Sequence, residues 1–162
     1  MSFEPVYSPH SRALILGTWP SPKSREIAFY YGHPQNRFWP MLAALTGEQT
    51  PAREDIAAKR QIILRHGLAL WDTLASCTIT GASDASIKDV VPNDIAALLA
   101  KAPIEAVFCN GATAYRIYTK YLLPVSGIEA VKLPSTSPAN AACCPEKLRA
   151  VWGEALGPWI SK

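Results

Sequence analysis

Residues 13–17 read Ala13-Leu14-Ile15-Leu16-Gly17, an apolar run that ends at a glycine. A short apolar run bounded by a turn residue is typical of a strand that is buried on both faces, as in a parallel sheet. Similar runs recur at residues 68–71, 105–109 and 129–133. We therefore predict a sheet of about four parallel strands.

Between these runs the apolar residues follow helical spacing. Helices are expected over 36–45, from Thr50 to near Gly67, and over 92–99, 112–121 and 145–159. For the second helix, Thr50 is the expected N-cap and Pro51 the first helical residue. Residues 76–89 are polar and rich in turn formers, so a surface loop is expected there. Alternating strands and helices predict a three-layer α/β/α sandwich, with residues 1–162 forming a single domain.

Composition bounds the functional class. The 162 residues are 49% hydrophobic and 18% charged, which argues against disorder, and the net charge of +3 permits a nucleic-acid partner without requiring one. The N-terminus lacks the apolar stretch of a signal peptide, and no apolar run reaches the roughly 18 to 20 residues of a membrane span. We expect a cytoplasmic protein with no membrane partner.

Cofactor signatures are missing from the sequence. No Cys-x-x-Cys pair occurs, and the four cysteines are not spaced like a zinc knuckle or an iron–sulfur ligand set. No glycine-rich nucleotide-binding loop and no Gly-x-Ser-x-Gly elbow is present. We expect neither a metal nor a cofactor, and we expect the cysteines to be reduced.

Ligands of parallel α/β sheets bind beyond the carboxyl ends of the strands. Three unusual segments fall there, at residues 17–39, 110–111 and 133–140. The first contains Gly17-Thr18-Trp19-Pro20 and later His33-Pro34-Gln35-Asn36-Arg37-Phe38-Trp39, and this combination resembles the mismatch-specific uracil and thymine-DNA glycosylases. With Tyr30-Tyr31-Gly32 before it and Leu133-Pro134-Ser135-Thr136-Ser137-Pro138-Ala139-Asn140 later, the pattern resembles the hypoxanthine-DNA glycosylase branch of the uracil-DNA glycosylase superfamily.

Further matching words at residues 70–72 and 108–111 extend the resemblance over nearly the whole chain. It implies a uracil-DNA glycosylase-like fold and cleavage of the N-glycosidic bond of a flipped, deaminated base. Double-stranded DNA is the implied partner, and we expect a monomer. Lys23 is the one lysine near the expected pocket, so a monofunctional enzyme that leaves an abasic site is expected.

Asn36 is the candidate catalytic residue. An amide can orient a water with its carbonyl and contact the base or sugar with its NH₂ group. Superfamily members commonly carry Asp or Asn in the Gly-x-x-Pro loop, where this chain has Thr18 and Trp19. The resemblance implies that Asn36 takes that role. The residues alone also allow Asn36 to cap the helix that follows it.

Base-binding residues implied by the resemblance lie in two of the segments. Tyr31 matches an aromatic residue that stacks on the flipped base, whereas we interpret Tyr30 as a core residue. Asn110 could read the base or could only cap the following helix. The full base-binding set is Gly17, Thr18, Trp19, Tyr31 and Asn110.

DNA-backbone contacts are expected from two loops. Hydroxyl, amide and basic side chains are suited to phosphate contacts, although such residues also form ordinary solvated loops. His33 could instead stabilise its own loop. The expected set is Lys23, Ser24, Arg25, His33, Ser135, Thr136, Ser137 and Asn140.

The chain departs from its mismatch-specific relatives at Ala139. There the relatives carry a bulky wedge side chain that fills the gap left in the base stack, and alanine is too small for that.

Two alternatives to hypoxanthine excision stay open. One is excision of uracil or mismatched thymine, which the missing Asp or Asn at residues 17–20 disfavours. The other is a non-catalytic DNA- or nucleotide-binding module.

Overall fold

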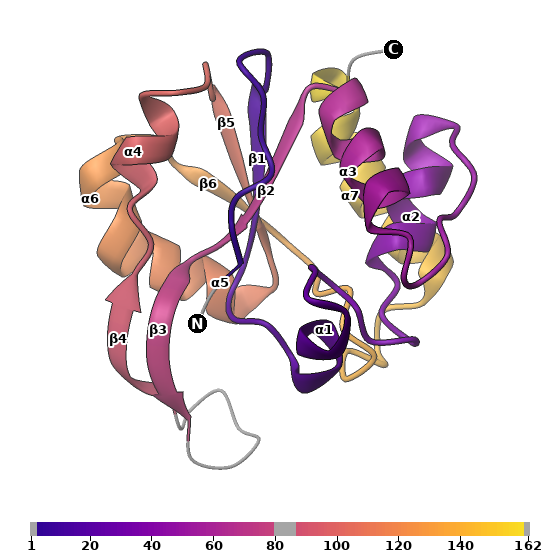
Figure 1. Ribbon diagram of the computed structural model, residues 1–162, viewed down its shortest axis with the longest axis horizontal. Helices are drawn as coiled ribbons and strands as arrows, with labels where there is room; N and C mark the ends of the chain where they lie inside the picture. Colours follow the sequence, from indigo (N-terminus) through magenta and orange to yellow (C-terminus); the bar gives the residue numbers. More distant parts are fainter. Residues whose placement is uncertain (1–2, 80–86, 161–162) are drawn as a thin grey trace.

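The computed structural model describes residues 3–79 and 87–160. A central sheet of four parallel strands has the order β2-β1-β5-β6 (Figure 1). Its strands are β1 (Ala13–Gly17), β2 (Leu68–Asp72), β5 (Ala106–Asn110) and β6 (Ala130–Leu133). The four predicted apolar runs thus coincide with the four strands, and the predicted parallel sheet is confirmed.

Helices cover both faces of this sheet (Figure 1). One layer contains α2 (Phe38–Thr46), α3 (Ile56–Arg65) and α7 (Pro145–Leu156), which ends in a 3₁₀ turn at Gly157–Trp159. The other contains α4 (Ile95–Leu99) and a helix made of α5 (Ala112–Ile117), a π-helical turn (Tyr118–Leu122) and α6 (Leu123–Ser126). Every residue of β1 and β2 is buried because the two layers enclose the sheet. The predicted three-layer α/β/α architecture is confirmed.

None of the helices in the described part of the chain is long and apolar enough to cross a membrane.

The N-terminal segment closes one edge of the sheet. Val6 forms an isolated antiparallel bridge with Leu70 of β2, and both main-chain hydrogen bonds of the pair measure 2.9 Å. The Trp71 indole also donates to the carbonyl of Phe3 at 3.1 Å. The free side of β2 is therefore paired with chain that precedes β1.

The expectation of a surface loop over residues 76–89 is wrong where the structure describes it. β3 (Leu74–Ile79) and β4 (Ile87–Pro92) form an antiparallel pair, and residues 80–86 lie outside the described part. Ser76, Lys88 and Asp89 are exposed, so these strands carry no apolar run and are held by cross-strand hydrogen bonds. Polar composition therefore concealed the pair.

Several helix boundaries also differ from expectation. α4 begins at Ile95, and Pro92, expected to open that helix, is the last residue of β4. α3 begins at Ile56, where the Asp55 carboxylate accepts from the main-chain N–H of Ala58 at 3.1 Å, so Thr50 and Pro51 precede the helix. Asp55 is an equally good cap and lies five residues further on. In addition, α1 (Pro22–Ile27) follows β1, and Ser21 caps it. That segment lies within the stretch that we treated as a loop.

Candidate active site

The carboxyl ends of the four parallel strands form one edge of the molecule. Gly17 of β1 lies opposite Asp72 of β2, and Asn110 of β5 lies opposite Leu133 of β6. The segments that follow β1 and β6 continue from this edge and carry most of the predicted site residues. The structure thus brings together the three segments that sequence analysis selected.

Gly17 lies where two polar side chains converge. A Cβ atom at this position would be 2.6 Å from Oδ1 of Asp72 and 3.0 Å from the Tyr31 hydroxyl. Both distances are shorter than a normal carbon–oxygen contact, so any larger residue would displace one of these groups. Glycine is therefore needed here for space, which allows two polar groups to approach the end of β1.

Asp72 is a buried carboxylic acid at this edge whose pKa is strongly shifted. It is only 4% exposed, and Oδ2 has no hydrogen-bond partner among the described residues. Burial raises the pKa of Asp72 to about 7, and the positive charge of Arg25 only partly opposes this shift. Asn93 holds the main chain beside it, because its amide donates to the carbonyls of Asp72 and Leu74 at 2.8 and 3.1 Å.

Tyr31 adopts the left-handed conformation, with φ at 54°, and its ring stacks on Phe38 at a centroid distance of 4.2 Å. Its hydroxyl is buried with no hydrogen-bond partner among the described residues. Burial, followed by the charge of Asp72, raises the pKa of Tyr31, while the nearby Asn110 amide opposes the shift without reaching hydrogen-bond geometry. Strain and an unpaired buried hydroxyl at one residue are features of ligand-binding positions.

Tyr30, in contrast, is a core residue, as predicted. It is 2% exposed, and its hydroxyl donates to the carbonyl of Glu4 at 2.8 Å.

Asn36 lies two residues before α2. Its Oδ1 atom accepts from the main-chain N–H of Phe38, the first residue of α2, at 2.9 Å, although the N-cap residue itself is Arg37. One lone pair of Oδ1 remains, and no described residue accepts from the NH₂ group. The side chain is half-buried. The bond to Phe38 orients the Asn36 amide and leaves its NH₂ group and one Oδ1 lone pair able to bond a second partner.

Arg37 connects the Asn36 segment to the loop after β6. Its main-chain N–H donates to Thr136 O at 3.1 Å. Its guanidinium donates to the carbonyls of Ser137 at 2.8 Å and Asn140 at 3.0 Å, and also to the carbonyl of Cys143. These contacts fix one site segment against another.

Asn110 and Thr136 form a reciprocal pair. The Asn110 amide donates to the Thr136 hydroxyl, and its carbonyl accepts from the Thr136 main-chain N–H, both at 3.0 Å. Asn110 does not cap α5, because the N-cap is Gly111 and no side chain bonds there. Thr136 is 1% exposed, so its position favours support of Asn110 over direct contact with phosphate.

The other polar residues of this loop organise its main chain. Ser135 and Ser137 accept from the N–H groups of Ser137 and Ala139 at 3.1 Å, and the Asn140 amide donates to Ser135 O at 3.0 Å. Each serine keeps its O–H as a donor. Ala139, at the expected wedge position, is exposed.

The predicted DNA-contact residues of α1 divide into two groups. Ser24 is 3% exposed and accepts from the Gly32 N–H at 2.9 Å, so it supports the loop from within. Lys23 and Arg25 are exposed, and the Arg25 guanidinium lies 4.8 Å from the centre of the Trp19 ring. DNA contact stays a prediction for Lys23 and Arg25.

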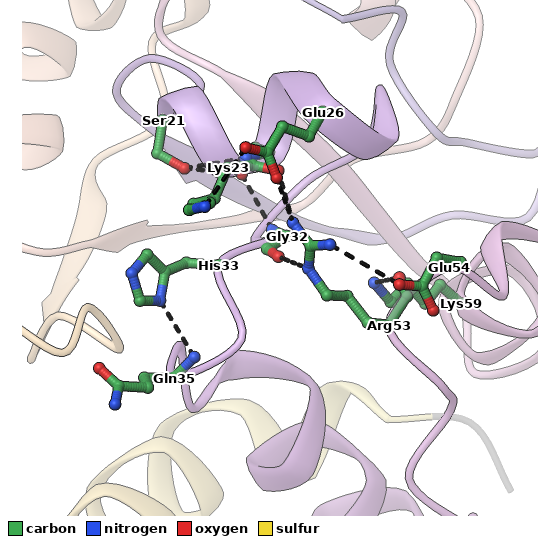
Figure 2. A network of polar contacts seen from close by, with 10 residues as sticks. Ser21, Lys23, Glu26, Gly32, His33, Gln35, Arg53, Glu54 and Lys59 are labelled. Atoms are coloured by element: carbon green, nitrogen blue, oxygen red, sulfur yellow. Dashed lines mark hydrogen bonds and ion pairs between the residues drawn. The ribbon is translucent and has the colours of Figure 1, made fainter.

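Arg53 braces the loop that carries His33. Its Nε donates to Gly32 O at 2.6 Å, and Nη2 contacts the Lys23 carbonyl and the Glu26 carboxylate, each at 3.1 Å (Figure 2). Lys59, buried under Trp39, donates to the carbonyl of Arg53 at 2.6 Å. Residues before α3 thus fix the position of α1 and of residue 32.

His33 stabilises its own turn. Its Nδ1 accepts from the main-chain N–H of Gln35 at 3.0 Å (Figure 2). Its carbonyl accepts from Asn36 N–H at the same distance. The side chain is half-buried, which leaves the DNA-contact prediction untested.

Three residues that form or support the site were not among the predicted site residues: Asp72, Arg37 and Arg53. Asp72 ends the second apolar run at the position equivalent to Gly17, and that was an available signal. No neighbouring sequence pattern indicates Arg53, because the carbonyls to which its guanidinium donates lie 21 and 30 residues earlier in the chain.

Elsewhere the structure offers weaker candidates for a functional site. The described residues contain no cluster of three or more potential metal ligands. A hollow of about 480 Å³ is lined only by Ala57, Arg60, Gln61, Leu64 and Arg65, all on α3. Because all of its lining residues lie on one helix, this hollow lacks the side chains from several elements that would hold a reacting group.

Comparison with known proteins agrees with this architecture. The uracil DNA glycosylase superfamily profile matches residues 4–155. The chain is 33% identical to a hypoxanthine DNA glycosylase of Methanosarcina acetivorans, over 85% of this chain and 86% of the relative. It is 30% identical to one of Methanosarcina barkeri, over 95% and 96%.

A solution NMR structure of a candidate uracil DNA glycosylase from M. acetivorans superposes with a TM-score of 0.77. That match has 31% identity and covers 94% of this chain and 96% of the other. With the fold, the strand-end site and the profile in agreement, the chain is a member of the uracil DNA glycosylase superfamily.

Proposed function

We propose that this protein is a monofunctional DNA glycosylase that excises hypoxanthine from deoxyinosine in double-stranded DNA and leaves an abasic site. One arrangement carries the proposal. The Tyr31 hydroxyl lies beside Gly17 at the end of β1, and Asn36 bonds the main chain of Phe38, whose ring stacks on Tyr31. The chain that holds these residues is a superfamily member. Similarity to two proteins named hypoxanthine DNA glycosylases supports the choice of base.

The chemistry assigns a task to each group. The target nucleotide leaves the duplex, and its base stacks on the Tyr31 ring, whose φ of 54° and packing on Phe38 fix its orientation. Asn36, oriented by its bond to Phe38 N–H, positions a water at C1′ with the remaining lone pair of Oδ1. As the glycosidic bond lengthens, the sugar becomes cationic and the base gains negative charge, which buried donors stabilise.

Duplex binding is assigned to the exposed side chains of Lys23 and Arg25 and to donors of the 134–140 loop. Ser135 and Ser137 retain hydroxyl donors. Because Ala139 offers little volume to fill a vacated stack, the enzyme is expected to prefer unstable pairs.

The test is a cleavage assay on labelled duplexes that each contain one deoxyinosine, one deoxyuridine or one G·T mismatch, followed by alkali. We expect strand breaks at deoxyinosine with the wild type, and a loss of about 10²–10³-fold with Asn36→Ala because the water is no longer held. Gln35→Ala is the matched control, because Gln35 is exposed and its side chain lies in the same turn.

Other outcomes would redirect the assignment. Breaks mainly at deoxyuridine or G·T would identify a uracil or mismatched-thymine enzyme and contradict the choice of base. Binding to all duplexes with no breaks in any would identify a non-catalytic DNA-binding module.

A further inference from the structure

Several buried polar atoms at or near the strand ends lack hydrogen-bond partners in the described part of the chain, among them Thr73 Oγ1, which directly follows Asp72 in the chain. Oδ2 of Asp72 and the hydroxyl of Tyr31 make no hydrogen bond with any described residue. An unsatisfied buried polar group destabilises the fold, and native proteins rarely keep one without a functional reason. Two such groups side by side indicate that a polar ligand completes them.

Their geometry sets the place of that ligand. Asp72 Oδ1 and the Tyr31 hydroxyl lie 2.6 and 3.0 Å from the Cβ position that Gly17 leaves empty. The two oxygens are therefore no further apart than the sum of these distances. A planar base stacked on the Tyr31 ring would bring its polar edge toward the groups at this point.

The surroundings of Asp72 favour a neutral carboxyl. Arg25 of α1 is the cation that acts on it, and Tyr30 and Tyr31 lie within range of its charge. Burial raises the pKa of both tyrosines, and it raises the pKa of Cys109, which faces Tyr31 from β5, to about 12. Among these acids Asp72 alone titrates near neutral pH.

We propose that Asp72 is a base-contacting residue that works in its neutral form: one carboxyl oxygen donates a hydrogen bond to a base acceptor, and the other accepts from a base N–H. The proposal rests on the glycosylase function above. Hypoxanthine carries N1–H beside the C6 carbonyl, and this edge complements a carboxylic acid. The Tyr31 hydroxyl, at the same point, supplies a second polar contact.

Charge explains why the neutral form is required. During hydrolysis the water oxygen bonds to C1′, the electron pair of the C1′–N9 bond passes to the base, and one proton of the water ends on the base. Until that proton arrives the base is negative. An ionised Asp72 would repel it, whereas an O–H donor stabilises it.

The test is the pH dependence of single-turnover excision from a deoxyinosine duplex, measured between about pH 6 and pH 9. We expect the wild-type rate to fall about tenfold per pH unit above about 7 as Asp72 ionises. Asp72→Asn, which keeps a donor and an acceptor at every pH, should remain active and lose this dependence. Asp72→Ala should lose about 10²–10³-fold at low pH.

Asp89→Asn is the matched control, because Asp89 is exposed on β4 and the chemical change is identical. A rate that rises with pH, or Asp72→Ala activity equal to wild type, would overturn the proposal. A pH profile that persists in Asp72→Asn would overturn it as well, because a group other than Asp72 would then set the pH dependence.

A second readout does not depend on catalysis. The ¹³C resonance of the Asp72 carboxyl is titrated in the Asn36→Ala variant, alone and with the deoxyinosine duplex. Binding should raise the pKa of Asp72, because the bound base needs the proton; an unchanged or lowered pKa would overturn the proposal. Wild-type protein inactive on every duplex would instead count against the proposed function, which this titration does not require.

Discussion

At the scale of single residues, a buried carboxyl group is the most consequential feature of the protein. Asp72 is enclosed at the end of β2 with an unpaired oxygen, and burial raises its pKa from 3.8 to about 7. The folded state therefore holds the Asp72 proton more tightly than the unfolded state does. This contribution to stability is fully present below about pH 4 and is lost as the pH rises to about 7.

Asp72→Asn is expected to remove that pH dependence, because the amide does not ionise. Between about pH 4 and pH 8 the variant should gain stability relative to wild type by roughly 4 kcal/mol, the free-energy equivalent of the shift. The measurement is the free energy of unfolding in urea at a series of pH values. Parallel pH curves for the two proteins would show that Asp72 ionises normally in the folded state.

At the scale of elements, the site depends on loops held in place by arginine side chains. Arg37 ties the segment before α2 to the loop after β6, and Arg53 ties α1 to Gly32. The planar guanidinium group contacts several carbonyls at once, which a lysine cannot do.

Arg53→Ala should therefore lower both stability and excision. Loss of the hydrogen bonds to Gly32 O and Lys23 O is expected to cost about 1–3 kcal/mol in the free energy of unfolding. The excision rate should fall because Tyr31 and Asn36 lie next to the released loop. Arg65→Ala provides the comparison, since its ion pair with Glu48 is 56% exposed on the arginine side and should contribute at most about 1 kcal/mol. Equal losses in urea unfolding and excision assays would contradict a specific role for Arg53.

The elements also show what the sequence could and could not predict. Apolar runs located β1, β2 and β5, because parallel strands that are buried on both faces need unbroken apolar sequence. β6 is a partly exposed strand at the end of the sheet, and its run contains Lys132. The β3–β4 pair escaped because Ser76, Lys88 and Asp89 face solvent. The start of α3 was misplaced because Thr50-Pro51 and Asp55 are both good helix starts, and local pattern cannot choose between them.

The site was predicted in the same uneven way. Motifs selected Gly17 and Asn110, which end neighbouring strands of the sheet, and Tyr31, whose hydroxyl lies beside Gly17. The catalytic and base-binding roles of these residues and of Asn36 stay predictions. Ser24 and Thr136 were selected as hydroxyl donors, yet both are buried and support neighbouring loops. Whether a hydroxyl faces solvent depends on packing between distant segments, which composition does not encode.

At the scale of the whole molecule, a net charge of +3 is too small for strong nonspecific attraction to DNA, so the position of each cation matters. Lys23 and Arg25 project from α1 beside the strand-end site.

Lys23→Ala is expected to weaken duplex binding and to reduce the slope of log K against log salt by about 1, the value for one lost phosphate contact. Binding would be measured by fluorescence anisotropy at several salt concentrations. Lys101→Ala is the control, because Lys101 is exposed and precedes the amino end of β5, whereas the site lies at the carboxyl ends of the strands. If both variants give the same salt slope as wild type, α1 does not contact the DNA backbone.

The bridge between Val6 and Leu70 bears on the risk of strand pairing between molecules. An unpaired strand edge presents free N–H and C=O groups that can recruit a second chain and start aggregation. The N-terminal segment occupies the groups of Leu70 on the β2 side, and at the other end of the sheet β6 is only four residues long and includes the exposed Lys132. Deleting the residues through Val6 would therefore uncover hydrogen-bonding groups on β2, a strand that is wholly apolar up to Asp72. Strand pairing between molecules would then become the main hazard for the shortened chain.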